Sequence, residues 1–365
     1  MRLTRVVLRD FRNWNSLQWQ PPPGPLWLVG ENGQGKSNLL EAIALPAQLR
    51  SIRGATDREM IRFGASQAEI FLAFEEKGEH HEVGLRLQPG GRQMHKDGRP
   101  QHKASALVGF LRVVPFQPED IALVAGPPAL RRRWLDVLLS ELSQPYLQQR
   151  SAYEHALRQR NALLRQGSYK TLAGWDEALS DAGAAVTIAR LSVVVQLTGL
   201  LQQLYQMLSG EKSQILVRYR SSWLSPSTVP PPFLEARGEL QEGLRQTAAL
   251  ERQREVTLVG PQRDDVALLV DGHEGRRHAS RGQQRLLALC LRLAEAKLLA
   301  ERYQDPPILL LDDLYSELDE VRQRRVSAFI QRFEQALMTT TQHAVAEKGT
   351  VFFVKSGTLH SLGDG

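Results

Sequence analysis

Length, composition and charge are those of a globular protein with an ample core. The chain has 365 residues, of which 42% are hydrophobic and 24% are charged, and its formal net charge is +6. The single cysteine, Cys290, excludes an internal disulfide framework and a cysteine-based zinc site. No apolar run approaches the ~18 residues of a membrane span, and the N-terminus lacks a signal peptide's apolar core, so we expect a cytoplasmic protein with no membrane partner.

Three regions differ in their predicted elements. Residues 1–117 contain short β-like runs separated by turn signals. Residues 118–254 have the apolar spacing of helices, interrupted by the strand-like segment SQILVRYR. Residues 255–365 return to β character, followed by a helix from Ser280, an apolar strand at 308–311, another helix and a strand near ALMTT. We predict an α/β fold in which the two end regions form one lobe around a sheet buried on both faces, with the middle region inserted as a helical lobe.

The strongest local signal is a glycine-rich turn between an apolar strand and a helix, LWLVGENGQGKSNLLEAIAL. Gly30, Gly33 and Gly35 let the backbone turn tightly so that its N–H groups face an anion, and the helix dipole adds to this effect. Lys36 is placed to reach the outer phosphates of a nucleotide, and Ser37 to hold Mg²⁺. The segment therefore predicts an ATP-binding phosphate loop.

A second apolar strand, at 308–311, ends in Asp312 and Asp313. Ligands in open α/β sheets bind at the carboxyl ends of the strands, so these carboxylates complete a Mg²⁺–ATP site. We predict that Asp312 anchors Mg²⁺ together with Ser37. Asp313 is expected to orient or deprotonate the attacking water. Lys36, Asp312 and Asp313 are thus the predicted catalytic residues, and the structural alternative for the two carboxylates is an acidic cap of the helix that follows.

The helix that begins at Ser280 has an unusual first turn, SRGQQ, before its apolar stretch. Glycine in a helix costs stability, so Gly282 indicates a place where a group must approach the backbone closely. Cys290, on the apolar face of this helix, is expected to be a core residue.

Three motifs occur in the order typical of ABC-type ATPases, which the chain resembles: the phosphate loop, SxGQQ from Ser280, and DDLYSELD at 312–319. Within that superfamily the chain is most similar, over almost its full length, to the RecF family of bacterial DNA replication and repair proteins. The segments that carry this similarity include LRDFRNW, PEDIALVAGPPALRRRWLD, VGPQRDDV and SRGQQRLLALCLRLAEA. The resemblance implies an ABC/SMC-type P-loop NTPase head with an inserted helical lobe and no long coiled coil.

The resemblance also implies a homodimer in which ATP is sandwiched between the phosphate loop of one subunit and the signature helix of the other. The positions expected to contact ATP in one subunit are Gly30, Glu31, Asn32, Gly33, Gln34, Gly35, Lys36, Ser37 and Arg12. The other subunit is expected to cover the same ATP with Ser280, Gly282 and Gln283. Asp319 is expected at the dimer seam.

Family members bind DNA when loaded with ATP and work with RecR and RecO to help RecA load at gaps in single-stranded DNA. The resemblance therefore implies an ATP-dependent DNA-binding protein of recombinational repair and replication-fork maintenance, acting at gaps and at junctions of single- and double-stranded DNA. Three features depart from the superfamily pattern: Arg281 replaces a glycine, Thr339 to Thr341 stand where many members have a switch histidine, and Asp313 replaces a glutamate. The last two predict slow ATP hydrolysis, with ATP used as a clamp.

Contacts with DNA are expected to involve phosphates, because the sequence shows no base-reading helix and no aromatic stacking platform. The candidates are arginines of the helical region and of the segment after the first helix, namely Arg131, Arg132, Arg133, Arg158, Arg160 and Arg165, with Arg50 and Arg53. The alternatives are an ordinary solvated helix face and a structural arginine cluster within RRRWLD.

Two other functions share the ATPase motifs, namely the ATPase subunit of an ABC transporter and an SMC-like chromosome-organising head. The LRDFRNW and GPQRDD segments argue against a transporter subunit. A chromosome-organising SMC protein needs a long coiled coil, for which the sequence shows no sustained heptad array.

Overall fold

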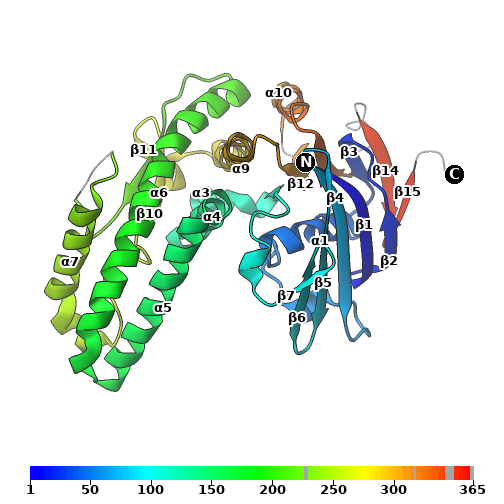
Figure 1. The fold of residues 1–365 in the computed structure, drawn as a ribbon. Coiled ribbons are helices and arrows are strands. Elements are labelled where there is room, and N and C mark those ends of the chain that lie inside the picture. Colours follow the sequence, from blue (N-terminus) through cyan, green and yellow to red (C-terminus); the bar gives the residue numbers. More distant parts are fainter. Residues whose placement is uncertain (226–228, 316–317, 342–348, 362–365) are drawn as a thin grey trace. The chain divides into compact units, whose positions relative to one another are not determined.

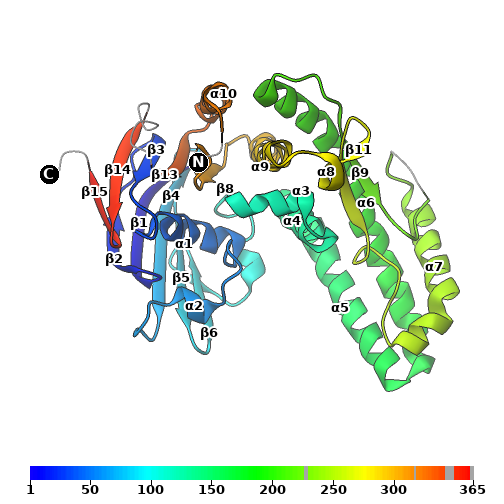
Figure 2. The same cartoon turned by 180° about the vertical axis from the view of Figure 1, so that it is seen from behind.

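The computed structural model describes residues 1–225, 229–315, 318–341 and 349–361 (Figures 1 and 2). Contacts divide the chain into two compact units. The first unit comprises Met1–Asp120, Met207–Ser209 and Arg292–Gly365, and the second comprises Ile121–Gln206 and Gly210–Leu291. The two ends of the chain thus share one unit. The first division lies close to the expected boundary after residue 117, whereas the second lies after residue 291 and differs from the expected boundary after residue 254.

The first unit contains an antiparallel sheet with the strand order β2-β1-β4-β5-β6-β7. Its strands are β1 (Arg2–Phe11), β2 (Trp14–Trp19), β4 (Ala68–Glu76), β5 (Glu79–Gln88), β6 (Gly91–Lys96) and β7 (Arg99–Gln101). Burial alternates along β4, as expected for a sheet with one face on the core. The β-like runs predicted for the first region are therefore mostly the strands of this sheet.

The second sheet of this unit has the order β15-β14-β3-β13-β12-β8 and is parallel except at its β15 edge. Its strands are β3 (Gly24–Val29), β8 (Val113–Phe116), β12 (Ile308–Leu311), β13 (Gln335–Thr340), β14 (Thr350–Lys355) and β15 (Thr358–Ser361). In the registers of β3, β13 and β12, Val29 lies opposite Thr340 and Leu311 opposite Met338. The carboxyl ends of the strands that precede the phosphate loop and the aspartate pair therefore meet at one edge.

Helix α1 (Lys36–Gln48) contacts strands of both sheets, and most of its residues are buried. The core of the first unit accordingly combines apolar side chains of α1 with those of the antiparallel and parallel sheets. In Figure 1 the helix lies beside the blue and cyan strands of the N-terminal region. This unit also contains α2 (Asp57–Met60), α10 (Glu320–Ile330) and the part of α9 (Arg281–Tyr303) from Arg292 onward. The 3-10 turn Ala104–Ala106 and most of the 3-10 turn Pro118–Ile121 belong to it as well.

The second unit is mainly helical. Its helices are α3 (Ala122–Ala125), α4 (Pro128–Leu142), α5 (Gln144–Gln166), the 3-10 turn Tyr169–Thr171, most of α6 (Leu172–Ser209), α7 (Phe233–Arg254), α8 (Gly275–His278) and the start of α9 (Arg281–Tyr303). Figures 1 and 2 both show α5, α6 and α7 running side by side. The helical spacing predicted for residues 118–254 corresponds to α3 to α7.

A small antiparallel sheet explains the position of the second division. Strand β10 (Asp265–Val270) pairs with β9 (Ile215–Arg220), which is the SQILVRYR segment, and with β11 (His273–Glu274). Because β9 belongs to the helical region, its pairing draws β10 and β11 into the second unit. The β character between residue 255 and the signature helix was correctly predicted, but its strands β10 and β11 join neither sheet of the first unit.

Helix α6 is long and apolar enough to cross a membrane by length and composition alone. The expectation that no apolar stretch reaches this length is therefore wrong for α6. Half of its apolar window is buried inside the protein, and a core helix passes the same test. The helix also carries Arg190, which is 4% exposed and pairs with Asp136 at 2.7 Å. These features agree with a helix packed within a helical unit.

Candidate nucleotide-binding site

The phosphate loop connects β3 to α1 and depends on two closely packed glycines. Gly35, at the N-cap of α1, has φ = 115°, and a Cβ there would lie 2.6 Å from the side-chain nitrogen of Asn13. A Cβ on Gly30 would overlap the backbone carbonyl of Val354. Gly33 also has a positive φ of 80°. Only glycine combines these conformations with these close approaches, as the sequence motif predicted.

Two turns outside the motif support the loop. Asn13 Nδ2 donates to the Gln34 carbonyl at 2.9 Å, and Trp14 Nε1 donates to the Gly35 carbonyl at 3.1 Å. On the other side, the Ser356 N–H donates to Gln34 Oε1 at 2.6 Å. Gln34 is therefore a residue that positions the loop from both sides.

Lys36 and Ser37 lie at the start of α1, next to the aspartate pair. The Lys36 ammonium donates to the carbonyls of Gly30 and Glu31 at 2.6 and 2.8 Å. Ser37 Oγ donates to Asp312 Oδ1 at 2.9 Å. The structure therefore brings together the lysine, hydroxyl and carboxylate that the sequence assigned to one site.

Thr339, which the sequence marked only as one of three threonines in place of a switch histidine, contacts both aspartates. Its Oγ1 donates to Asp312 Oδ1 at 2.6 Å and accepts from the Asp313 N–H at 2.8 Å. Its side chain is buried, and it lies at the end of β13, adjacent to β12. The signal was available, because a polar residue at the carboxyl end of a parallel strand in this fold class faces the ligand edge.

Burial acts on the charged groups of the site. It lowers the pKa of Lys36, against the opposing charges of Asp312 and Asp313. It raises the pKa of Asp312, against hydrogen bonds from Thr339 and Ser37. Both shifts have the direction expected for groups partly removed from water. The charged forms of both groups would therefore be favoured by an additional ligand of opposite sign.

These groups line a cavity of about 320 Å³. Its lining includes Asn32, Gly33, Gly35, Lys36, Ser37, Asp312, Asp313, Thr339 and Arg53. Arg53 was predicted to contact DNA, but the structure places it here, where its guanidinium donates to Asn38 Oδ1 at 3.1 Å. Gly30, Glu31 and Gln34 belong to the phosphate loop but do not line this cavity.

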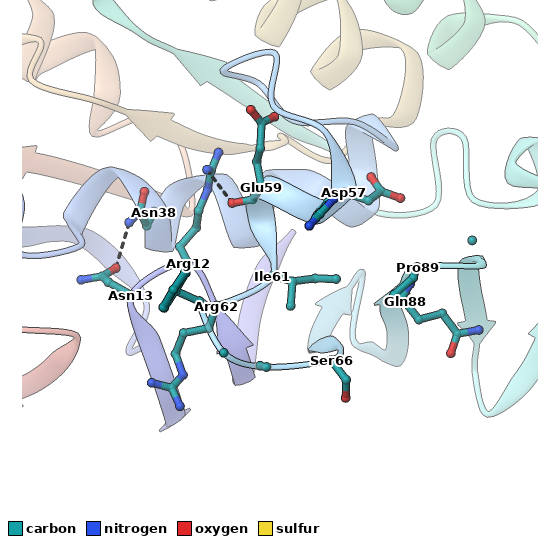
Figure 3. Close-up of a pocket in the computed structure, with 15 residues that line it drawn as sticks. Arg12, Asn13, Asn38, Asp57, Glu59, Ile61, Arg62, Ser66, Gln88 and Pro89 are labelled. Carbon is teal, nitrogen blue, oxygen red and sulfur yellow. Dashed lines mark hydrogen bonds between the residues drawn. The ribbon is translucent and has the colours of Figure 1, made fainter.

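Arg12 is not among the residues lining this cavity. Its guanidinium pairs with Glu41 of α1 at 2.9 Å and donates to the Glu59 carbonyl at 2.9 Å. It lines a neighbouring cavity, of about 1110 Å³, shown in Figure 3. Asn38 lines both cavities, and Figure 3 shows it bonded to Asn13. Arg12 therefore lines the cavity next to the phosphate-loop cavity, and Asn38 lines both.

The signature residues lie at the start of α9 and form a capping box. The Gln283 N–H donates to Ser280 Oγ at 3.2 Å, and the Ser280 N–H donates to Gln283 Oε1 at 2.9 Å. Gly282 is exposed, and a Cβ there would meet no atom within 4 Å. No packing within the part of the chain that the structure describes thus requires glycine at this position. Cys290 is fully buried, as expected, and burial raises the pKa of its thiol.

Asp319 is the N-cap of α10. Its side chain accepts a hydrogen bond from the Arg322 N–H at 2.9 Å, which lowers the pKa of the carboxyl, and it is 55% exposed. The neighbouring Ser316 and Glu317, and His343 after β13, lie outside the described residues. The acidic-cap alternative thus describes Asp319, whereas Asp312 and Asp313 line the cavity.

The candidate DNA-contacting arginines separate into two groups. Arg131 pairs with Asp265 at 2.9 Å, and Arg160 pairs with Asp176 at 2.6 Å and with Glu251 at 2.7 Å; both arginines are buried. Their burial in ion pairs does not fit a DNA contact, so the structural alternative describes them. Those that are exposed or half-buried are Arg50, Arg132, Arg133, Arg158 and Arg165, together with Arg53, which lines the phosphate-loop cavity.

Known proteins resemble the chain over nearly its whole length. Residues 2–357 match the family described as RecF/RecN/SMC N terminal domain. The DNA replication and repair protein RecF of Halalkalibacterium halodurans is 35% identical over 378 aligned positions, covering 100% of both chains. The RecF protein of Acidothermus cellulolyticus is 38% identical and covers 93% of this chain and 94% of its own.

Solved structures also resemble the chain over nearly its whole length. A structure of the recombination mediator protein RecF with ATP, from the RecFOR pathway, superposes with a TM-score of 0.93 at 27% identity and covers 99% of both chains. An SMC head bound to the C-winged helix domain of ScpA matches with a TM-score of 0.57 at 14% identity, which shows a shared ABC/SMC-type fold alone. The chain therefore belongs to the RecF family of DNA replication and repair proteins.

Proposed function

We propose that the protein is an ATP-dependent DNA-binding protein of recombinational repair, which dimerises on DNA when Mg²⁺–ATP is bound. The observation that carries this proposal is the hydrogen-bonded set of Ser37, Asp312 and Thr339 inside the phosphate-loop cavity. This set joins three chain segments at the one edge of the sheet where nucleotides bind in this fold class.

The residues present fit both parts of the ligand. Lys36 and the N-terminus of α1 supply positive charge for the outer phosphates, and Arg53 adds a second basic side chain to the same cavity. Ser37 and Asp312 offer hydroxyl and carboxylate oxygens, the ligands that Mg²⁺ prefers. When bound, Mg²⁺ would neutralise charge on the phosphates. Asp313 is the residue proposed to orient or deprotonate the attacking water.

We propose that the rest of the nucleotide extends towards the cavity of Figure 3. Because Asn38 lines both cavities, a nucleotide with its phosphates at the loop has the neighbouring cavity, with Arg12, beside it. This placement supports the expected role of Arg12 towards the nucleotide. The adenosine would then lie towards Arg12 and Asn13.

The signature turn supports a site shared between two subunits. Ser280, Arg281 and Gly282 are exposed, and the space beside Gly282 is open. A glycine that no described neighbour requires is expected where a group from outside the chain approaches. We propose that this group is the ATP of a second subunit, with Asp319 near the seam and Gln283 covering the nucleotide.

Slow hydrolysis is part of the proposal. Asp313 is one methylene shorter than glutamate, and the β13 end supplies Thr339, whose hydroxyl is already engaged by Asp312 and Asp313. We expect a turnover well below ~10 s⁻¹, the median for enzymes. ATP would then act as a clamp that holds the dimer on DNA.

Partners follow from the relatives. One related structure is described as a mediator of the RecFOR pathway, so RecO and RecR are the proposed protein partners, with RecA loading at DNA gaps as the outcome. The net charge of +6 favours sequence-independent contact with both single- and double-stranded DNA. We propose that the protein acts in the cytoplasm of a bacterium, at gaps formed during DNA damage and replication.

Gel filtration tests the proposal in three steps: protein alone, protein with Mg²⁺–ATP, and protein with Mg²⁺–ATP and gapped DNA. We expect ATP to shift the protein to a dimer and gapped DNA to retain it. Lys36→Met is the control variant, and it should do neither. A wild-type monomer indifferent to both ATP and DNA would contradict the proposal.

A further inference from the structure

The helical unit contains a polar cavity that the ATP site does not use. Its volume is about 350 Å³, and its walls come from the first turn of α4, the middle of α5 and the loop before β10. Its lining includes Ala129, Arg132, Leu157, Asn161, Gln262 and Arg263. The segments GPPALRRRWLD and VGPQRDDV therefore meet at this cavity.

The cavity is lined by two arginines, Arg132 and Arg263, that form no ion pair with the described residues. Arg132 donates to the Asp264 carbonyl at 2.7 Å, and Arg263 donates to the Thr257 carbonyl at 3.3 Å. Across the described ranges, neither guanidinium lies within ion-pair distance of an acidic side chain. The neighbouring Asp265 is already held by Arg131 through two hydrogen bonds. An anion is the ligand that such a cavity favours.

The electrostatics of Arg132 point in the same direction. Burial, and then the charge of Arg190, lower the pKa of Arg132, although Asp265, Asp136 and Asp264 oppose the shift. A cation with a lowered pKa is stabilised when an anion binds beside it. Arginine also matches the geometry of phosphate oxygens better than lysine does.

The wall of the cavity is held in place by its own hydrogen bonds. Asn161 Oδ1 accepts from the N–H and the hydroxyl of Thr257, at 2.8 and 2.7 Å. Gln262 accepts from the Tyr153 hydroxyl and donates to the Val259 carbonyl at 2.9 Å. Side chains fixed in this way bind an oxyanion with little loss of conformational entropy.

Helix α4 adds backbone donors at the same place. Its N-cap residue Pro127 and its first residue Pro128 have no N–H, so Ala129 supplies the first backbone N–H of the helix. The first turn contains no acidic residue. The positive end of the helix dipole therefore acts together with the two arginines.

The positive surface continues beyond the cavity along α5. Leu157 and Asn161 are four residues apart and line the cavity, and Arg165 follows after another four. Helical periodicity places Arg158 on this face as well. Arg158 and Arg165 are both exposed. A row of cations leading out of an anion cavity suits a polymer with regularly spaced phosphates better than a single small anion.

We propose that this cavity holds one backbone phosphate of a DNA strand, bound by Arg132 and Arg263, with Arg158 and Arg165 contacting neighbouring phosphates. The inference rests on the proposed function, because it names where a DNA-binding member of this family touches DNA. The contact reads no base, so binding at this cavity is independent of sequence.

The test is DNA binding by Arg263→Gln and by Arg132→Gln, measured with Mg²⁺–ATP over a range of salt concentrations. Arg263 is exposed, so its variant keeps the fold, and a thermal melt checks this for both variants. Each variant should bind about tenfold more weakly. The slope of log K against log salt should fall by about one for each lost phosphate contact. Arg245→Gln is the matched control, because Arg245 is 71% exposed on α7 and lies outside the cavity; it should change neither quantity.

The outcomes separate the two proposals. If the wild-type protein binds DNA and both variants keep its affinity and slope, this inference is overturned while the proposed function stands. If the wild type does not bind DNA at all, both are overturned. In a third arm, the melting temperatures of the wild type and of the variants are measured with and without inorganic phosphate. If phosphate stabilises the wild type but not the variants while DNA binding is unchanged, the cavity holds a small anion and the DNA assignment is overturned.

Discussion

At the scale of single residues, the fate of a basic side chain depends on its position around a helix. Arg131, Arg132 and Arg133 are consecutive in α4, and each step along the helix turns by about 100°. The first is buried in an ion pair, the second is half-buried at a cavity, and the third is exposed. The run RRR therefore predicted positive charge correctly, but its spacing alone did not say which arginine faces a partner.

Thr339→Val tests the hydroxyl that joins the two aspartates. Valine keeps the shape but removes a hydrogen bond to Asp312 and one from the Asp313 N–H. Because Asp312 is buried, we expect the free energy of unfolding to fall by about 1–3 kcal/mol. Urea unfolding without nucleotide measures this change.

Thr341→Val is the matched control for that measurement. Thr341 lines the same cavity but is exposed, so its substitution should change stability by no more than ~0.5 kcal/mol. Equal stability of Thr339→Val and the wild type would show that the hydroxyl contributes nothing to the folded state.

At the scale of elements, local patterns and long-range pairings were predicted with different success. The phosphate loop and the β12 strand carry their signals within a few residues, and both lie as predicted. The pairing of β9 with β10 joins residues about 50 positions apart, for example Arg220 with Asp265. The local sequence does not predict which strands pair, because each strand could pair with any other strand of suitable length. The division of the chain after residue 291 could not be predicted for this reason.

Gly282→Ala tests whether the first turn of α9 meets a second subunit. Within the chain a methyl group there has open space, and alanine favours a helix by about 1 kcal/mol over glycine. We therefore expect the variant to be at least as stable as the wild type, yet to dimerise poorly with ATP. Thermal unfolding and gel filtration measure the two effects. Full ATP-dependent dimerisation by a normally folded variant would contradict a close approach at Gly282.

Asp264→Asn tests the buried network beneath β9. Burial raises the pKa of Asp264 to about 6, and the Tyr219 hydroxyl donates to it at 2.7 Å. Because the folded state binds this proton more tightly than the unfolded state, the contribution to stability is present at low pH and is lost as pH rises through about 6. Asparagine does not titrate. Between pH 8 and pH 4.5, the free energy of unfolding of the wild type should therefore rise by about 2 kcal/mol relative to that of the variant.

Urea unfolding at several pH values measures this difference. Asp271→Asn is a suitable control, because Asp271 is exposed and its variant should follow the wild type closely. A wild-type advantage that is independent of pH would show that Asp264 does not bind a proton preferentially in the folded state.

At the scale of the whole molecule, the residues proposed to contact ATP divide between the two units. The phosphate loop and the aspartate pair belong to the first unit, and the signature turn belongs to the second. The sequence instead predicted residues 255–365, with the signature turn, as part of the lobe that holds the phosphate loop, so this division was not predicted. The shared site was predicted only through the resemblance to ABC-type ATPases, since no pattern within one chain shows that a site needs two copies. A shared site is therefore a property of the assembly and must be tested on mixed subunits.

Mixing Lys36→Met with Ser280→Arg makes that test. In a symmetric dimer with composite sites, each mixed dimer has one site with both defects and one with none, so random mixing restores about a quarter of the wild-type sites. ATP hydrolysis by the mixture should then exceed that of either variant alone. The control is the double variant, Lys36→Met with Ser280→Arg in one chain, mixed with wild type. Each of its mixed dimers has one defect in each site, so this mixture should lose activity in proportion to the mixed dimers formed. If the sites are complete within one chain, the first mixture shows only the average of its two variants.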